Sequence, residues 1–117
     1  THFDGDVNLD HQIVYKSTLV ATRPIPGQPV KELYCYKVPS STEWSPQIIT
    51  SIFMPNVLVD ISEYYTKKEQ AIKMYQTELR DYPHPRSIEY VKKCDGAAGI
   101  KFGINFAEEF MLLRKIL

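Results

Sequence analysis

An aspartate–histidine pair, Asp10 and His11, is the part of this sequence with the clearest potential for chemistry. The pair follows a polar turn made of Asp4, Gly5 and Asp6 and precedes a segment with helical apolar spacing. A carboxylate beside an imidazole at the start of a helix can present that imidazole to a metal ion. A helix cap followed by a solvated histidine has the same appearance, with Asp10 as the cap. The chemistry of the pair alone leaves both interpretations open.

The bulk composition narrows the class of protein. The 117 residues are enough for one domain, and 14 basic residues balance 14 acidic ones, so neither nucleic acid nor an anionic membrane is expected as a partner. No apolar run approaches the ~20 residues of a membrane span, and the start is polar, unlike a signal peptide. We therefore expect a cytoplasmic location. Cys35 and Cys94 are interpreted as buried thiols, and a disulfide between them is the alternative.

Short motifs along nearly the whole chain occur in the order typical of one enzyme family. They are residues 2–11 (His-Phe-Asp-Gly-Asp-Val-Asn-Leu-Asp-His), 39–44 (Pro-Ser-Ser-Thr-Glu-Trp), Pro55-Asn56 with Asp60-Ile61, the spaced Lys68, Ala71, Tyr75 and Glu78, 83–87 (Pro-His-Pro-Arg-Ser), and 99–110 with Ala107-Glu108 and Phe110. Together they resemble the LmbE-like (PIG-L) de-N-acetylases, zinc-dependent enzymes that remove acetyl groups from N-acetylated sugars. The resemblance implies a hydrolase that splits the linear amide C–N bond of an N-acetylglucosamine-type sugar or glycoconjugate.

The resemblance also implies an α/β fold, the three-layer Rossmann-like arrangement of that family. Residues 1–117 would be the C-terminal portion of a single such domain, because the family's first metal motif, a His-Pro-Asp-Asp-Glu type run, does not occur here. In the family that run supplies the other zinc ligands and the general base. We therefore expect the N-terminal half of the domain as a partner, and we expect the isolated chain to bind zinc weakly and to be inactive. A homo-oligomer is the other expected association.

The second metal motif of the family implies roles for several residues here. Its last histidine corresponds to His11, the implied Zn²⁺ ligand, and Asp10 is expected to orient that imidazole or cap the helix. Asn8 stands where many members carry a histidine that stabilises or protonates the tetrahedral intermediate. Asparagine can donate a hydrogen bond but cannot transfer a proton, so His2 is the alternative acid. Asp10 and Asn8 are thus the candidate catalytic residues.

Apolar spacing and turn residues predict the secondary structure. Helices are expected at about 11–22, 67–79 and 86–101, strands at 31–38 and 57–61, and a short strand or extended segment at about 109–113. Thr66 and Glu69 form a capping box for the second helix. In the third helix, Gly96 and Gly99 indicate close backbone approach to a neighbour.

The loop at 39–47 follows the carboxyl end of a predicted strand, where α/β proteins bind ligands. Ser41, Thr42 and Glu43 are therefore candidate substrate-binding residues, with ordinary turn hydrogen bonding as the alternative. Trp44 could cover a sugar face or anchor the packing of the loop. For the whole chain, a non-catalytic interaction module derived from the same fold is the alternative function. A carrier domain that holds a surface metal through His11 and nearby acids is another.

Overall fold

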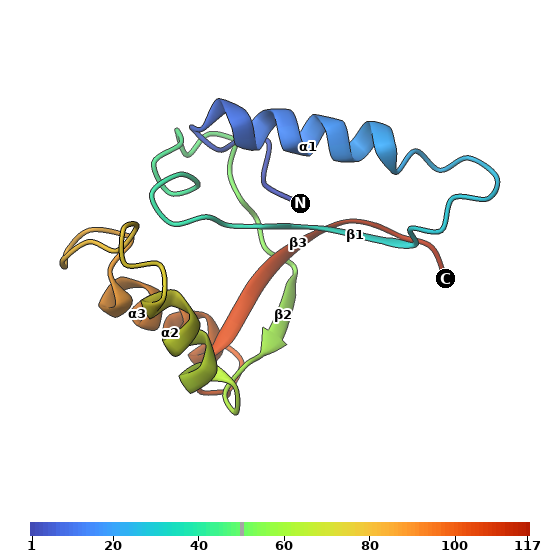
Figure 1. Cartoon of the computed structure of the whole chain (residues 1–117). Helices are drawn as coiled ribbons and strands as arrows, with labels where there is room; N and C mark the ends of the chain where they lie inside the picture. Colours follow the sequence, from blue (N-terminus) through green and yellow to red (C-terminus); the bar gives the residue numbers. More distant parts are fainter. Residues whose placement is uncertain (50) are drawn as a thin grey trace. The chain divides into compact units, whose positions relative to one another are not determined.

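The computed structural model describes residues 1–49 and 51–117. Its elements are α1 (Leu9–Ala21), β1 (Glu32–Tyr36), β2 (Val57–Asp60), α2 (Tyr65–Lys73), α3 (Ile88–Ile100) and β3 (Ala107–Lys115) (Figure 1). The strands form one three-stranded sheet in the order β1-β3-β2, so the fold is α/β. The chain divides into two units, Thr1–Val57 with Phe110–Leu117 and Leu58–Glu109, and each is described by itself. No helix in the described part of the chain is long and apolar enough to cross a membrane.

Strand β1 lies within the stretch predicted as a strand, and its side chains alternate between more exposed and buried positions. It pairs antiparallel with β3, from Glu32 opposite Lys115 to Tyr36 opposite Phe110. The side chain of Leu33 is 7% exposed and that of Cys35 is fully buried, whereas their neighbours are more exposed. Strand β3 confirms the strand expected at about 109–113 and is longer, from Ala107 to Lys115.

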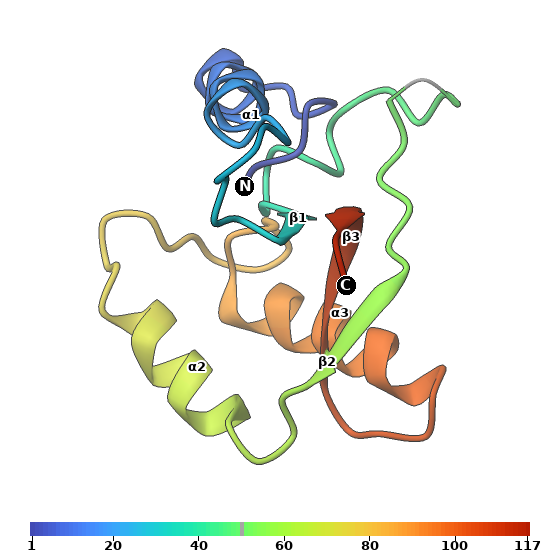
Figure 2. The ribbon, with the colours of Figure 1, turned by 90° about the vertical axis from the view of Figure 1, so that its right-hand side faces the viewer.

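A second pairing of β1 involves the first residue of the chain. The terminal amino group of Thr1 donates to the carbonyl of Tyr34 at 2.7 Å, and the carbonyl of Thr1 accepts the N–H of Tyr36 at 3.2 Å. Thr1 thus bonds to the two residues on either side of Cys35. This pattern is typical of parallel strands. Helix α1 connects this parallel segment to β1. The helix lies beside β1 in both views (Figures 1 and 2).

Helix α1 confirms the predicted helix but begins two residues earlier, at Leu9 rather than at His11. Its N-cap is Asn8, whose backbone is extended and whose carbonyl accepts the N–H of Gln12 at 3.3 Å. The prediction of Asp10 as the cap is therefore wrong, because Asp10 already has helical backbone and an exposed side chain in the first turn. None of the helix residues is buried.

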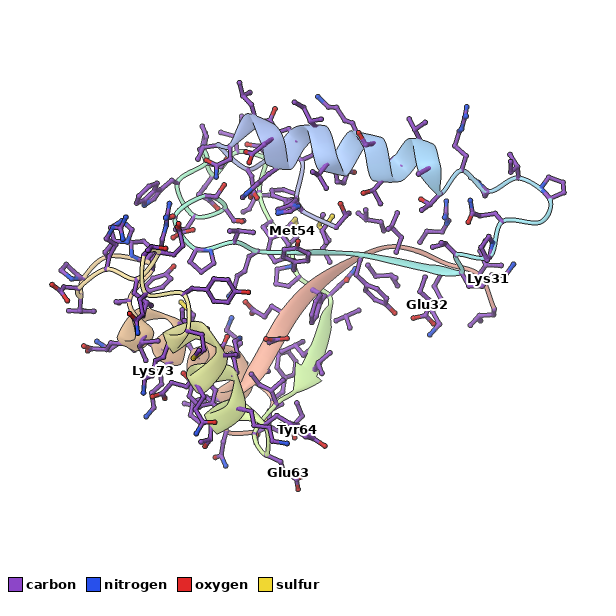
Figure 3. The ribbon with its side chains drawn as sticks, viewed as in Figure 1. Lys31, Glu32, Met54, Glu63, Tyr64 and Lys73 are labelled. Carbon is purple, nitrogen blue, oxygen red and sulfur yellow. The ribbon has the colours of Figure 1, made fainter. Side chains whose placement is uncertain are left out.

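In the second unit, α2 ends at Lys73 rather than near residue 79 and begins after Tyr64 (Figure 3). Its N-cap is Tyr64, which makes no side-chain capping bond. The predicted capping box is wrong, since Thr66 lies inside the helix and the carboxylate of Glu69 pairs with Lys73 instead. The helix starts earlier because Tyr65 is buried and the carbonyl of Tyr64 already accepts the N–H of Lys68 at 3.1 Å. The first helical turn therefore includes Tyr65.

Helix α3 lies within the predicted range and is capped by Ser87, whose Oγ accepts the N–H of Tyr90 at 3.1 Å. Gly99 makes the predicted close approach, because a Cβ there would lie 2.7 Å from the carbonyl oxygen of Ile104. Gly96 does not, since its nearest neighbour would be a ring carbon of Phe106 at 3.8 Å.

Tyr65 and Lys68 connect the elements of the second unit. The ring of Tyr65 stacks on that of Phe106 with centroids 3.9 Å apart, and burial, followed by the charge of Asp95, raises the pKa of Tyr65 to about 12. The ammonium of Lys68 lies 2.7 Å from a carboxylate oxygen of Asp95 and 2.7 Å from one of Glu108. The side chain of Lys68 is only 25% exposed between these two carboxylates.

Candidate functional site

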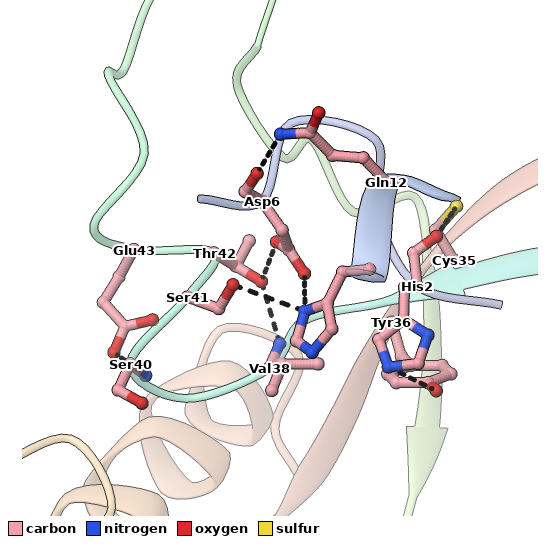
Figure 4. Close-up of polar contacts among 11 residues, drawn as sticks. His2, Asp6, Gln12, Cys35, Tyr36, Val38, Ser40, Ser41, Thr42 and Glu43 are labelled. Atoms are coloured by element: carbon pink, nitrogen blue, oxygen red, sulfur yellow. Dashed lines mark hydrogen bonds and ion pairs between the residues drawn. The ribbon is translucent and has the colours of Figure 1, made fainter. Parts of the chain in front are cut away.

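The imidazole of His11 is held by a buried carboxylate. Its Nδ1 lies 2.9 Å from Oδ2 of Asp6 (Figure 4). The side chain of Asp6 has no exposed surface, and that of His11 is 13% exposed. Asp6, rather than the exposed Asp10, therefore orients the ring. Sequence reasoning missed Asp6 because an aspartate after glycine is also an ordinary turn residue.

Three further hydrogen bonds fix Asp6 in place. The hydroxyl of Thr42 donates to Oδ1 of Asp6 at 2.6 Å, and the Nε2 amide of Gln12 donates to the backbone carbonyl of Asp6 at 2.7 Å. The backbone N–H of Asp6 donates to the carbonyl of Phe3 at 3.3 Å. A buried carboxylate is stable only when its oxygens accept hydrogen bonds, and here both do.

The loop after β1 brings Thr42 to this carboxylate. Ser40 has a φ of 64°, in the left-handed region, and its N–H donates to Oε1 of Glu43 at 2.6 Å. The chain then folds back, so that the N–H groups of Ser41 and Thr42 donate to the carbonyl of Val38 at 3.1 and 3.0 Å. A strained residue at such a turn is typical of functional loops.

This geometry changes the interpretation of the three predicted substrate-binding residues. Thr42 is 6% exposed and gives its only hydroxyl proton to Asp6, so we reassign it from the substrate to the support of His11. The carboxylate of Glu43 accepts a hydrogen bond from the backbone N–H of Ser40 in the same loop. Ser41 is buried with its Oγ 3.4 Å from Nδ1 of His11, so it lies at the site. Trp44 is 55% exposed and is therefore not a buried packing anchor.

A second histidine lies against the first. The rings of His2 and His11 have centroids 4.1 Å apart, and Nε2 of His2 lies 3.5 Å from the hydroxyl of Tyr36. Nδ1 of His2 is buried and has no hydrogen-bond partner among the described residues. Burial, and next the electrostatic interaction with His11, lower the pKa of His2, which favours its neutral imidazole. The thiol of Cys35 donates to the carbonyl of His2 at 3.2 Å and anchors its backbone.

Nε2 of His11 is a donor atom that could fill one ligand position of a zinc ion. Residues 1–49 and 51–117 contain no cluster of three His, Cys, Asp or Glu side chains that could hold a metal. His11 nevertheless has the arrangement that metal-binding histidines show, because its Nδ1 contacts a carboxylate and its Nε2 makes no hydrogen bond to the described residues. A catalytic zinc site needs about three protein ligands, and the described residues do not bring three together.

Within the described part of the chain, the structure shows no hydrogen bond from the side chains of Asn8, His84 or Arg86 to His11. Asn8 caps α1 through its backbone, and its side chain makes no capping hydrogen bond. His84 accepts the N–H of Arg86 at 3.0 Å, and Arg86 pairs with Glu78 at 2.6 Å, both within the second unit. These contacts agree with a structural role for the proline-flanked connector.

Both cysteines are free thiols, so the alternative of a disulfide is not formed. Cys35 is buried as expected, whereas Cys94 is only partly buried.

Comparison with protein-family models, with curated proteins and with solved structures finds no match.

Proposed function

We propose that this chain carries one zinc ligand of a deacetylase that acts on N-acetylated sugars, of the LmbE-like type. The observation that carries the proposal is the contact between His11 and Asp6, which leaves Nε2 of a partly exposed imidazole available. A carboxylate behind an imidazole makes the ring a stronger ligand and fixes its direction. When bound, Zn²⁺ would polarise the acetamide carbonyl and activate water.

His2 and Ser41 are the proposed additional groups at the site. His2 lies against His11, and its lowered pKa favours the neutral imidazole, in which one ring nitrogen donates a hydrogen bond and the other accepts one. We propose that it holds a polar atom of the bound substrate, in the role for which sequence analysis first named Asn8. The Ser41 hydroxyl lies within the same cluster and can donate to an oxygen of the substrate.

The fold at the start of the chain supports the Rossmann-like assignment. Thr1 pairs in the parallel sense with β1, and α1 connects the two. Parallel neighbours joined through a helix are the βαβ unit from which such folds are built. The His2 and His11 side chains then follow the carboxyl end of this parallel segment, the edge where α/β proteins bind ligands. We propose that the remaining zinc ligands come from the N-terminal half of the same domain.

The decisive experiment measures acetate release by the natural gene product that contains this chain. N-acetyl sugars are supplied as a panel, with zinc and with a chelator. We expect zinc-dependent release that His11→Ala abolishes. The matched control is His84→Ala, which removes a histidine of the second unit and should leave release unchanged. Equal release by the wild type and His11→Ala would remove His11 from the site.

An interaction module is the second candidate function, and the exposed face of α1 favours it. Leu9, Ile13 and Val20 are 72, 63 and 59% exposed, although their spacing is that of a buried helical face. Such a surface is typical of a helix that packs against another body. Absence of acetate release from every sugar, together with a stable complex in size-exclusion chromatography, would favour this second function.

A further inference from the structure

A chain of hydrogen bonds runs from the backbone of Val38 to the ring of His11. The N–H of Val38 donates to Oγ1 of Thr42 at 2.8 Å, and Thr42 donates to Oδ1 of Asp6 at 2.6 Å. Oδ2 of Asp6 then meets Nδ1 of His11 at 2.9 Å (Figure 4). Thr42 and Asp6 are 6 and 1% exposed, which limits the water available to alter this order.

The direction of every proton in this series of hydrogen bonds follows from its first donor, the N–H of Val38. A backbone N–H can only donate, so the Val38 amide occupies a lone pair of the Thr42 hydroxyl. The single hydroxyl proton must therefore point to Asp6, whose Oδ1 becomes an acceptor. The carboxylate of Asp6 can only accept hydrogen bonds, so the 2.9 Å contact between Oδ2 and Nδ1 requires the proton to be on Nδ1 of the imidazole.

We propose that Thr42 is a positioning residue that acts through Asp6 to hold His11 in the Nδ1–H tautomer. Nε2 then keeps its lone pair and is the only ring nitrogen offered to a divalent cation. The tautomer of a histidine is set by the hydrogen bond that its other nitrogen makes. The use of Nε2 for a cation rests on the proposed function, whereas the tautomer does not depend on it.

The Ser41 hydroxyl is the competing partner for the same ring nitrogen. Its Oγ lies 3.4 Å from Nδ1, against 2.9 Å for the carboxylate of Asp6. A hydrogen bond to a charged acceptor is also about twice as strong as one between neutral groups. Asp6 therefore determines the tautomer of His11, and the Ser41 hydroxyl does not compete for the proton on Nδ1.

Replacing Asp6 by asparagine tests whether Thr42 sets the direction. In Asp6→Asn the Thr42 proton still needs an acceptor, so the amide oxygen should turn to Thr42 and the amide NH₂ to His11. Nδ1 must then accept, and the ring proton should move to Nε2. Adding Thr42→Val to Asp6→Asn removes that proton, and the amide can turn its oxygen back toward Nδ1–H.

The readout is long-range ¹H–¹⁵N NMR of the imidazoles in this 117-residue chain, recorded at a pH of about 8, above the ordinary titration range of histidine. We expect the Nδ1–H signature of His11 in the wild type and in Thr42→Ser, and the Nε2–H signature in Asp6→Asn. The double variant should return at least partly to Nδ1–H. Asp10→Asn, an exposed change beside His11, is the control and should show Nδ1–H.

An Nε2–H signature in the wild type overturns the proposal, whether or not any variant folds. So does a folded Asp6→Asn that keeps Nδ1–H, because the Thr42 proton would then not direct the amide. Backbone amide spectra report folding in each sample. A correct tautomer without acetate release would refute the enzymatic function and leave this inference intact.

Discussion

Nδ1 of His11 lies 2.9 Å from Oδ2 of Asp6, and five positions separate the two residues in the sequence. The carboxylate has no exposed surface and accepts hydrogen bonds at both oxygens. The ring nitrogen that remains available is Nε2, and its direction is determined by contacts within the first unit.

Asp6→Asn should weaken zinc binding by the natural gene product about 10- to 100-fold, the usual effect of losing a carboxylate behind a metal-bound histidine. Competition with a chromogenic zinc chelator measures the affinity. Asp10→Asn is the matched control, since it removes the same charge at an exposed position one residue from His11. Equal losses in both variants would mean that overall charge, rather than the contact with His11, governs affinity.

Cys35 should resist alkylation. Its side chain is fully buried, and burial raises the pKa of its thiol to about 11, so very little thiolate is present near pH 8. Mass spectrometry after brief treatment with iodoacetamide should find Cys94, which is partly exposed, modified first. Denaturation should make both cysteines reactive. Modification of Cys35 at the rate of Cys94 in the native chain would contradict the burial.

Tyr65 should make stability fall at high pH. Its folded pKa of about 12 lies above the ordinary 10.0, so between these values the unfolded chain loses the proton while the native state keeps it. The free energy of unfolding therefore decreases as the pH rises from 10 toward 12, by ~2–3 kcal/mol in total from this group. Urea unfolding of wild type and Tyr65→Phe at a series of pH values isolates the effect. The difference between the two should change only above pH ~10, and parallel curves would contradict it.

Gly99→Ala and Gly96→Ala should have opposite effects on stability. A Cβ at Gly99 would lie 2.7 Å from the carbonyl oxygen of Ile104 and 2.9 Å from the backbone nitrogen of Phe106, so the backbone must move, at a cost of ~1–3 kcal/mol. At Gly96 the nearest atom is 3.8 Å away, and alanine should stabilise α3 by up to ~1 kcal/mol. Thermal unfolding measures both. Destabilisation by Gly96→Ala as large as that by Gly99→Ala would argue against the described packing.

Lys68→Met should destabilise the second unit by ~2–4 kcal/mol, because it removes the cation that lies between Asp95 and Glu108. The effect should be smaller than for a fully buried pair, since the Lys68 side chain keeps 25% of its exposure. Lys67→Met, at the exposed neighbouring position, should change stability by less than ~0.5 kcal/mol. Urea unfolding compares them, and equal small effects would show that the pairing contributes little.

The local patterns in the sequence were sufficient to predict most of the elements. The strand predicted at 31–38 contains β1, and helical apolar spacing predicted α1 and α3. These signals succeed because they depend on neighbours a few positions apart. Helix ends were less predictable: the capping motif at Thr66 is plausible by itself, but packing around the buried Tyr65 started α2 earlier.

The sequence by itself determined that a histidine with acidic neighbours, His11, stands near the start of a helix, because that depends only on local order. Only the tertiary structure decided which carboxylate serves it. Asp10 is closer in sequence but points to solvent from the first turn of α1, whereas Asp6 is turned inward by a hydroxyl 36 positions away, that of Thr42. Hydrogen bonds between distant segments leave no local signature, so the identity of the buried acid could not be predicted from spacing.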